Sequence, residues 1–261
     1  MTNTPNLNHR QVQLLELIEA RESVSVNYLI DSFQASPATI RKDLTLLESM
    51  SLIRRTRGEA HIQNKSMLPF IPFPLRSQSN ITPKRLVAQE ALRFIDDDDT
   101  IILDDGTTTL EIAKLLDKFQ RLTVITHSFD IANLLCGKPN ITVVVPGGIL
   151  TAETRSLLGP YTENFYSTIE AKKFFLSTTG VRGGGGLTVT NPMEASVKKN
   201  AVQAARQVIA VFDSSKWNQT AMNLCATFQE LDMIITNTGA DIDESTKAIL
   251  DENHVQLVFA P

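Results

Sequence analysis

Cysteine is scarce in this chain, with Cys136 and Cys225 the only two among 261 residues. Two thiols so far apart fit neither a disulfide framework nor the ligand spacing of a zinc site, so we expect both to be reduced packing residues. Long apolar runs are also missing, and residues 1–6 lack the basic and hydrophobic regions of a secretory signal. We therefore expect a cytoplasmic protein that does not enter a membrane.

Excess positive charge is lacking too, because 25 Lys and Arg stand against 29 Asp and Glu, a net charge of −4. This balance argues against a protein that coats nucleic acid over its whole surface. The basic residues are unevenly spread, so a local cationic surface is expected near the N-terminus. Between residues 36 and 58 the acidic side chains are Asp43 and Glu48, and the basic ones are Arg41, Lys42, Arg54, Arg55 and Arg57.

Three short helices followed by a β-hairpin are predicted for residues 7–64. Apolar residues at helical spacing predict a helix from about Asn8 to Glu19, and Ser25 is expected to cap a second helix. Ser36 as N-cap and Pro37 at the first helical position predict a third. One face of this third helix should be buried and the opposite face exposed. The first carries Ile40, Leu44 and Leu47, and the second carries Pro37, Ala38, Arg41, Lys42 and Thr45.

Small residues followed by cations suit a helix that enters the major groove of DNA, although a merely solvated basic face has the same pattern. The hairpin, with its turn at Arg57 and Gly58, favours a winged helix-turn-helix domain, in which hairpin arginines contact phosphates. The predicted DNA-binding residues are Ser36, Pro37, Ala38, Thr39, Arg41, Lys42, Thr45, Arg54, Arg55 and Arg57.

Residues 65–83 are predicted to be a linker, because Pro69, Pro72, Pro74 and Pro83 forbid a continuous helix. From residue 84 to 261, short apolar strands alternate with amphipathic helices, a pattern typical of an α/β domain with a mainly parallel sheet. The aspartates at 96–99 are expected to form a solvated turn, with a divalent cation site as the open alternative. Helices are expected at about 84–94, 108–118, 128–135, 192–205 and 243–253, and strands at 100–103, 122–126, 141–145, 173–177, 208–212, 233–236 and 255–259.

The first of these strands, residues 100–103, turns through Asp104, Asp105 and Gly106 into a helical pattern, which aims backbone N–H groups at one point. Threonine hydroxyls can donate to phosphate oxygens there, and Asp104 or Asp105 can accept from sugar hydroxyls. A phosphorylated polyol would satisfy both. With no ligand, the same stretch would be a capped βα turn with Thr108 or Thr109 as N-cap.

Other strands end in similar residues, and the carboxyl ends of parallel strands share one edge of a sheet. Lys216 is the natural counter-charge for a phosphate, although most lysines simply face solvent. His127 is expected to be a polar loop residue, because the sequence fixes no carboxylate beside it. The predicted effector-binding residues are Asp105, Gly106, Thr107, Thr108, Thr109, Thr126, His127, Ser128, Gly147, Gly148, Glu194, Lys198 and Lys216.

Two parts of the chain resemble the DeoR family of bacterial transcriptional regulators. The first comprises residues 36–44, 47–48 and 52–58, and the second includes residues 105–108, 126–128, 147–148, 158–160, 186–188, 194–195 and 213–216. The resemblance implies a winged helix-turn-helix domain and a sensor domain similar to ribose-5-phosphate isomerase that senses a phosphorylated sugar without converting it. The family usually has Asn at the position of His127 and His at the position of Arg57.

Two functions follow as hypotheses. In the first, a homo-dimer or homo-tetramer binds double-stranded operator DNA and represses carbohydrate utilisation until a sugar phosphate binds. In the second, the chain is a sugar-phosphate isomerase with a nucleic-acid-binding module, using Asp105 or Glu194 as base and Lys216 or Lys198 to stabilise an enediolate. The first needs no catalytic residue, cofactor or metal ligand, and none is predicted.

Overall fold

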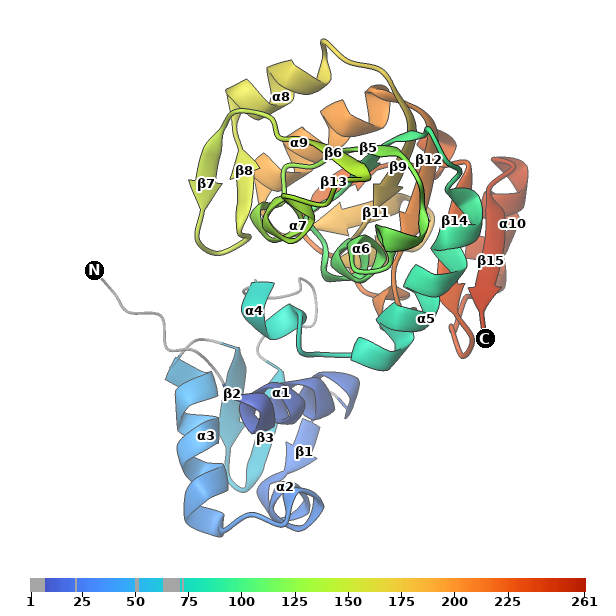
Figure 1. Cartoon of the computed structure of the whole chain (residues 1–261). Helices are drawn as coiled ribbons and strands as arrows, with labels where there is room; N and C mark the ends of the chain where they lie inside the picture. The colour runs from blue at the N-terminus through green and yellow to red at the C-terminus, as the bar shows by residue number, and fades with distance from the viewer. Residues whose placement is uncertain (1–7, 22, 50–51, 63–70, 72) are drawn as a thin grey trace. The chain divides into compact units, whose positions relative to one another are not determined.

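The computed structural model describes residues 8–21, 23–49, 52–62, 71 and 73–261 (Figure 1). The chain divides into two compact units, residues 1–79 and 80–261. Their boundary falls within the predicted linker, of which residues 65–70 and 72 lie outside the described residues. In the part of the chain that is described, no helix combines the length and the apolar character that crossing a bilayer requires.

The N-terminal unit contains three helices and a small antiparallel sheet in the order β1-β3-β2. Its core includes Leu14, Leu29, Ile40 and Leu44, each fully buried. The helices and the hairpin match the predicted winged helix-turn-helix, whereas the short β1 was not predicted. The elements are α1 (His9–Arg21), β1 (Ser23–Ser25), α2 (Val26–Phe33), α3 (Pro37–Ser49), β2 (Ile53–Thr56) and β3 (Glu59–Ile62).

Two serines cap the helices of this unit as the sequence predicts. Ser25 Oγ accepts from the backbone N–H of Tyr28 at 3.1 Å, and Ser36 Oγ accepts from that of Thr39 at 3.2 Å. Such caps replace hydrogen bonds that the first turn of a helix lacks. Gly58 adopts a positive φ of 81° in the turn between β2 and β3, a conformation that costs other residues strain.

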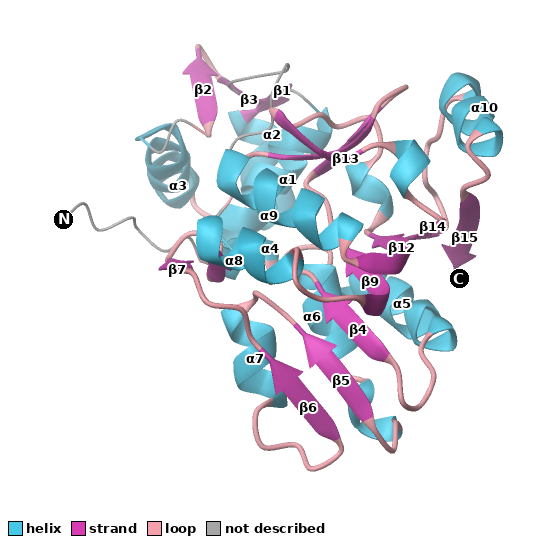
Figure 2. Ribbon diagram, turned by 90° about the horizontal axis from the view of Figure 1, so that it is seen from above, coloured by secondary structure: helices cyan, strands magenta, loops and turns pink. Residues whose placement is uncertain are grey.

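The C-terminal unit is built on a seven-stranded parallel sheet in the order β15-β14-β12-β9-β4-β5-β6 (Figure 2). Each strand is short, and the five inner strands are largely buried, which explains their continuous apolar runs in the sequence. The strands are β4 (Thr100–Leu103), β5 (Leu122–Ile125), β6 (Ile141–Val144), β9 (Ala171–Leu176), β12 (Ala205–Val211), β14 (Met233–Asn237) and β15 (Gln256–Ala260).

Helices cover both faces of this sheet, because alternate strand residues point into two separate cores. Ile101 and Leu103 pack with α5, α6 and α7, whereas Ile102 points into the core formed with α8, α9 and α10. An antiparallel sheet in the order β10-β11-β13 lies on that second side. These elements are α5 (Ile81–Ala91), α6 (Thr107–Ala113), α7 (Phe129–Leu135), α8 (Pro160–Tyr166), α9 (Pro192–Gln203), α10 (Glu244–Glu252), β10 (Gly180–Arg182), β11 (Gly186–Val189) and β13 (Asn223–Ala226).

Several details differ from expectation. Helix α5 begins at Ile81, because Pro83 falls in its first turn, where a backbone N–H has no partner to lose. The helix expected to run to residue 118 ends at Ala113, and a 3-10 turn, Leu116–Lys118, follows. Cys136 is exposed, so it is not a packing residue, whereas Cys225 is buried. Further elements were not predicted: α4 (Phe73–Arg76), and the hairpin of β7 (Ile149–Thr151) and β8 (Ser156–Leu158).

The acidic run at 96–99 is only partly solvated. Asp96, Asp97 and Asp98 are exposed, but Asp99 is buried and its Oδ2 accepts from Lys173 Nζ at 2.7 Å. Lys172 contacts the other oxygen of Asp99. Burial opposes ionisation of Asp99, but these two ammonium groups outweigh it and lower its pKa. The protein's own lysines therefore take the place that a cation would have.

Candidate functional site

Helix α3 presents the basic face that the sequence predicts. Ile40, Leu44 and Leu47 are fully buried, whereas Arg41 and Lys42 are exposed on the other side. The remaining residues predicted for that face, Pro37, Ala38 and Thr45, are exposed too. The sequence pattern therefore correctly predicted which face of this helix is buried and which is exposed.

One of the two acidic residues of this helix, Asp43, does not share the exposed face. Asp43 is 3% exposed, and its carboxylate accepts from Arg10 Nε and from Gln11 Nε2, both at 2.7 Å. Both donors come from α1. The carboxylate of Asp43 therefore holds α1 against α3. Because it does not lie on the exposed face of α3, that face carries less negative charge than the sequence of the helix suggests.

The predicted hairpin arginines divide into two kinds. Arg55 is committed to the fold, because its Nε donates to Glu48 Oε2 at 2.9 Å and its backbone N–H donates to Glu48 Oε1 at 3.0 Å. These bonds tie β2 to α3 and lower the pKa of Glu48. Arg54 and Arg57 are exposed and form no salt bridge within the described residues. Arg41, Lys42, Arg54 and Arg57 form what we call the cationic face.

Three predicted DNA-binding residues also stabilise the helix itself. The hydroxyls of Ser36 and Thr39 lie 2.8 Å apart at the start of α3, where Ser36 caps the helix. Thr45 Oγ1 donates to the backbone carbonyl of Arg41 at 2.8 Å. All three remain at least partly exposed. Capping and contact with DNA are compatible at such positions.

In the C-terminal unit, several of the polar residues at the strand ends lie near the point where the strand order reverses. The chain passes from β4 to β5 and β6 on one side, and β9 lies on the other side of β4. In open parallel sheets, ligands bind outside the carboxyl ends of strands at such a point. Here it lies between the turn after β4 and Ser177, which follows β9.

The turn after β4 is packed tightly against Ser177. A Cβ atom added at Gly106 would lie 2.1 Å from Ser177 Oγ, so only glycine fits. Gly106 is the N-cap of α6, and Thr109 Oγ1 donates to the carbonyls of Asp104 and Gly106 at 2.7 and 2.8 Å. The ligand-free alternative, in which Thr108 or Thr109 caps this helix, is therefore wrong in its choice of cap, because the glycine turn starts the helix earlier.

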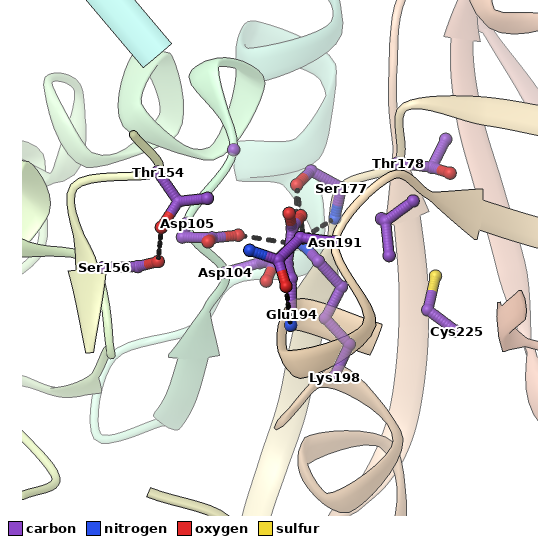
Figure 3. Close-up of polar contacts among 12 residues, drawn as sticks. Asp104, Asp105, Thr154, Ser156, Ser177, Thr178, Asn191, Glu194, Lys198 and Cys225 are labelled. Carbon is purple, nitrogen blue, oxygen red and sulfur yellow. Dashed lines mark hydrogen bonds and ion pairs between the residues drawn. The ribbon is translucent and has the colours of Figure 1, made fainter. Parts of the chain in front are cut away.

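Lys198 of α9 reaches into this turn and joins the carboxylates there (Figure 3). Its Nζ lies 2.9 Å from Asp105 Oδ1 and 3.3 Å from Glu194 Oε1, and it also contacts Asp104 Oδ2. All four side chains are at most 4% exposed. Burial alone would lower the pKa of Lys198, but the three carboxylates raise it well above its usual value. The predicted grouping of Asp105, Glu194 and Lys198 is present.

His127, another predicted effector residue, lies beside the same carboxylates, a contact that the sequence alone did not fix. Its Nε2 is 3.4 Å from Asp104 Oδ1 and 3.8 Å from Asp105 Oδ1, and its Nδ1 is 2.9 Å from the hydroxyl of Tyr166. Burial would lower the pKa of His127, but Tyr166 and the two carboxylates raise it well above its usual value. The sequence could not place Asp104 here, because it follows β4 whereas His127 follows the adjacent β5.

Other predicted effector residues have structural partners or lie elsewhere. Thr126 Oγ1 accepts from the backbone N–H of Ser128 at 3.1 Å, and Ser128 Oγ caps α7 at 3.3 Å. Thr107, Thr108 and Thr109 are buried. Gly147 and Gly148 are exposed after β6, where the Gly147 carbonyl accepts from Thr162 Oγ1 at 2.7 Å.

Lys216 stands apart from Lys198 and its carboxylates. It follows β12, and β9 separates β12 from β4 in the sheet. Burial opposes ionisation of Asp213, but the charges of Lys216 and Lys84 and hydrogen bonds from Ser215 lower its pKa. Lys216 therefore already interacts with a carboxylate of its own loop.

Three residues of the site were missing from the predicted set. Asp104 was predicted as a possible acceptor for sugar hydroxyls but was not included in the effector-binding set. Ser177 was predicted only as the last residue of a strand. Its position after β9, adjacent to β4, was the available signal. No sequence signal pointed to Tyr166, which comes from α8.

Each of the two units matches the model of a known protein family. Residues 10–66 match a family model described as the DeoR-like helix-turn-helix domain, and residues 79–238 match one described as the DeoR C terminal sensor domain. The second model alone covers more than half of the chain.

Curated relatives match over nearly the whole length. The chain is 36% identical to an uncharacterized HTH-type transcriptional regulator, YulB, of Bacillus subtilis, over 97% of this chain and 96% of the relative. It is 31% identical to the transcriptional repressor AccR of Agrobacterium fabrum, over 88% and 89%. It is 27% identical to the glycerol-3-phosphate regulon repressor of Escherichia coli, over 94% and 95%. These are names of transcription regulators, not of enzymes.

Solved structures with a similar arrangement are more distant. One is a D-ribose-5-phosphate isomerase in complex with phospho-erythronic acid, with a TM-score of 0.40 and 19% identity over 52% of this chain and 54% of that one. Another is ribose 5-phosphate isomerase A of Methanocaldococcus jannaschii, with a TM-score of 0.40 and 18% identity over 53% and 55%.

Proposed function

The chain belongs to the DeoR family of transcription regulators, and we propose that it represses a carbohydrate-utilisation operon under the control of a phosphorylated sugar. The protein works in the cytoplasm as a homo-dimer or homo-tetramer bound to double-stranded operator DNA. The observation that carries this proposal is the exposure of Arg41 and Lys42 on a helix whose opposite side forms the core of a winged helix-turn-helix domain.

Arg41 and Lys42 lie in the first half of α3, the part of a recognition helix that contacts base edges. Arg54 and Arg57 of the hairpin contact phosphates and set the position of the helix. Arg55 contributes indirectly, by fixing the hairpin to α3 through Glu48. Two copies of the domain would read two half-sites related by the symmetry of the dimer.

The effector binds at the carboxyl ends of β4, β5 and β9. Asp105, Glu194 and Lys198 are nearly completely buried, as are Thr107, Thr108 and His127, so a ligand reaches them only if the segments that cover them move. The hairpin of β7 and β8 is one such segment, since Leu157 N–H donates to the His127 carbonyl at 2.8 Å. A site that opens on binding favours one arrangement of the domain over another, as a sensor requires.

The test begins with DNA selected by the full-length protein from a pool of random duplexes. Arg41→Ala should weaken binding and relax base preference, because a bidentate base contact is worth about 1–3 kcal/mol. Arg54→Ala should weaken binding to all sequences and reduce the salt dependence by about one phosphate contact. Arg206→Ala, an exposed arginine of the C-terminal unit, serves as the control and should bind like the native protein.

A panel of sugar phosphates, each paired with its free sugar, then tests the effector. A phosphorylated member should release the selected DNA and be recovered unchanged, whereas its free sugar should not. If no DNA sequence is enriched, or if Arg41→Ala keeps the native base preference, the DNA-binding assignment is wrong. Release by the free sugars instead would contradict the phosphate requirement alone.

A further inference from the structure

His127 and Asp104 form a buried ion pair that is longer than an ordinary charge-assisted hydrogen bond. The Nε2 atom of His127 and the Oδ1 atom of Asp104 lie 3.4 Å apart. Neither atom has a hydrogen-bond partner in the described part of the chain, and both side chains are fully buried. Charge-assisted N–H···O bonds are about 2.7–2.9 Å long. Because buried polar atoms nearly always have a partner, these two indicate a further group between them.

Neighbouring residues hold the two atoms in place. The other oxygen of Asp104, Oδ2, accepts from the backbone N–H of Ser177 at 2.8 Å and also contacts Lys198 Nζ, which leaves Oδ1 turned toward His127. On the far side of the imidazole, Nδ1 lies 2.9 Å from the Tyr166 hydroxyl. A metal ion would displace the proton from Nε2, and with Nδ1 donating to Tyr166 the lone pair of Nε2 then points at the carboxylates. Histidines that bind metals are oriented by a second hydrogen bond in this way.

We propose that Asp104, Asp105 and His127 bind a divalent transition-metal ion. Their ligand atoms all lie within 4.8 Å of one another, and Asp105 Oδ1 is 3.8 Å from His127 Nε2. A tetrahedral ion with bonds of about 2.0–2.2 Å sets its ligand atoms roughly 3.3–3.6 Å apart. The separation of Asp104 and His127 already falls in that range. Three protein ligands leave a fourth position for water or another oxygen.

The ligand types favour zinc, cobalt or manganese over magnesium or calcium, which prefer oxygen ligands alone. Lys198 does not compete for the same oxygen of Asp104, because it contacts Oδ2. Its ammonium does lie 2.9 Å from Asp105 Oδ1, so it stays close to the ion. Glu194, 3.3 Å from Lys198 Nζ, helps to offset that repulsion. The sequence predicted no metal site, because its ligands follow two different strands.

The test uses the untagged full-length protein, so that no polyhistidine binds metal. After chelator treatment and incubation with Zn²⁺, Mn²⁺ or Co²⁺, elemental analysis should find about one ion per chain. The melting temperature should rise by roughly 5 °C or more with excess metal. His127→Asn should lose both effects. His61→Asn should keep them, although His61 Nε2 also lies 3.4 Å from a carboxylate, that of the exposed Glu59.

The Co²⁺-loaded protein provides a readout that does not depend on stability. Its visible d–d absorption should show ligation by nitrogen and oxygen and should disappear in His127→Asn. The proposal is overturned if the native protein takes up none of the three ions, or if His127→Asn retains as much metal as the native protein. Neither measurement involves DNA or a sugar phosphate, so a failure here leaves the proposed function untouched.

Discussion

Lys198 is the buried cation at the centre of the carboxylate cluster in the C-terminal unit. Its ammonium is fully buried against Asp104, Asp105 and Glu194. Removing one partner of such a group leaves the others as buried charges without compensation, which typically costs about 3–5 kcal/mol. The net contribution of the intact group is much smaller, because all its members lost their hydration on folding.

We therefore expect Lys198→Met to lower the free energy of unfolding by about 3–5 kcal/mol. Lys199→Met is the matched control, because the neighbouring Lys199 is exposed and should change stability by less than about 0.5 kcal/mol. Urea unfolding of the full-length variants measures both values. Equal stability of the two variants would mean that the carboxylates are neutral or solvated, contrary to the arrangement around Lys198.

At the residue scale, the sequence predicted groups that lie on one element better than groups that join several. Glu194 and Lys198 are four positions apart on one helix, so their proximity followed from helical geometry. The contact of His127 with Tyr166 joins residues 39 positions apart. Such a contact depends on how α8 packs on the sheet, which no local pattern encodes.

At the scale of elements, the turn from β4 into α6 depends on one glycine. Gly106 has an extended backbone, with φ −78° and ψ 162°, so its requirement is space and not an unusual conformation. An added methyl group would meet both Oγ and Cβ of Ser177, at 2.1 and 2.3 Å. Because Ser177 also donates to Asp104, a shift of Ser177 would disturb the carboxylate that faces His127.

Gly106→Ala should destabilise the C-terminal unit by about 1–3 kcal/mol, the usual range for overpacking. Gly147→Ala is the control, because its added Cβ would approach the nearest heavy atom, Tyr161 Cβ, only to an ordinary 3.9 Å. Thermal unfolding followed by circular dichroism compares the two. A Gly106→Ala variant as stable as Gly147→Ala would show that Ser177 can move freely, and the close packing of this turn would have no energetic importance.

A strong end signal led to a correct prediction for α3 but was not sufficient everywhere, because α8 begins at Pro160 and was missed. Helix α3 begins at Pro37 after the Ser36 cap, as the sequence indicated. The parallel strands were found because each is a short apolar run between helices. The strands β10, β11 and β13 are three or four residues long, and the first two flank a glycine-rich turn. Their pairing depends on contacts with α9 and the main sheet, which the sequence does not reveal.

At the scale of the whole molecule, the two units have distinct chemistry. The N-terminal unit exposes the cationic face, whereas the C-terminal unit buries Lys198 and the carboxylates around it at the ends of its strands. The proline-containing segment and the shift in charge predicted this division of roles from sequence. Neither of these sequence features predicts how an effector changes the affinity for DNA. Such coupling requires two states of the molecule with different affinities for DNA and for the effector.

Coupling between the two ligands has to be reciprocal, and this gives a sharp prediction. If a sugar phosphate weakens binding to the selected DNA by some factor, that DNA must weaken binding of the sugar phosphate by the same factor, typically about 5–150-fold. Calorimetric titration of the active sugar phosphate into the free protein and into the protein–DNA complex measures the second factor. A scrambled duplex is the control and should leave the sugar phosphate affinity unchanged. If the two dissociation constants are equal, binding of that sugar phosphate is not coupled to binding of DNA, and the proposed control of DNA binding by that sugar phosphate is wrong.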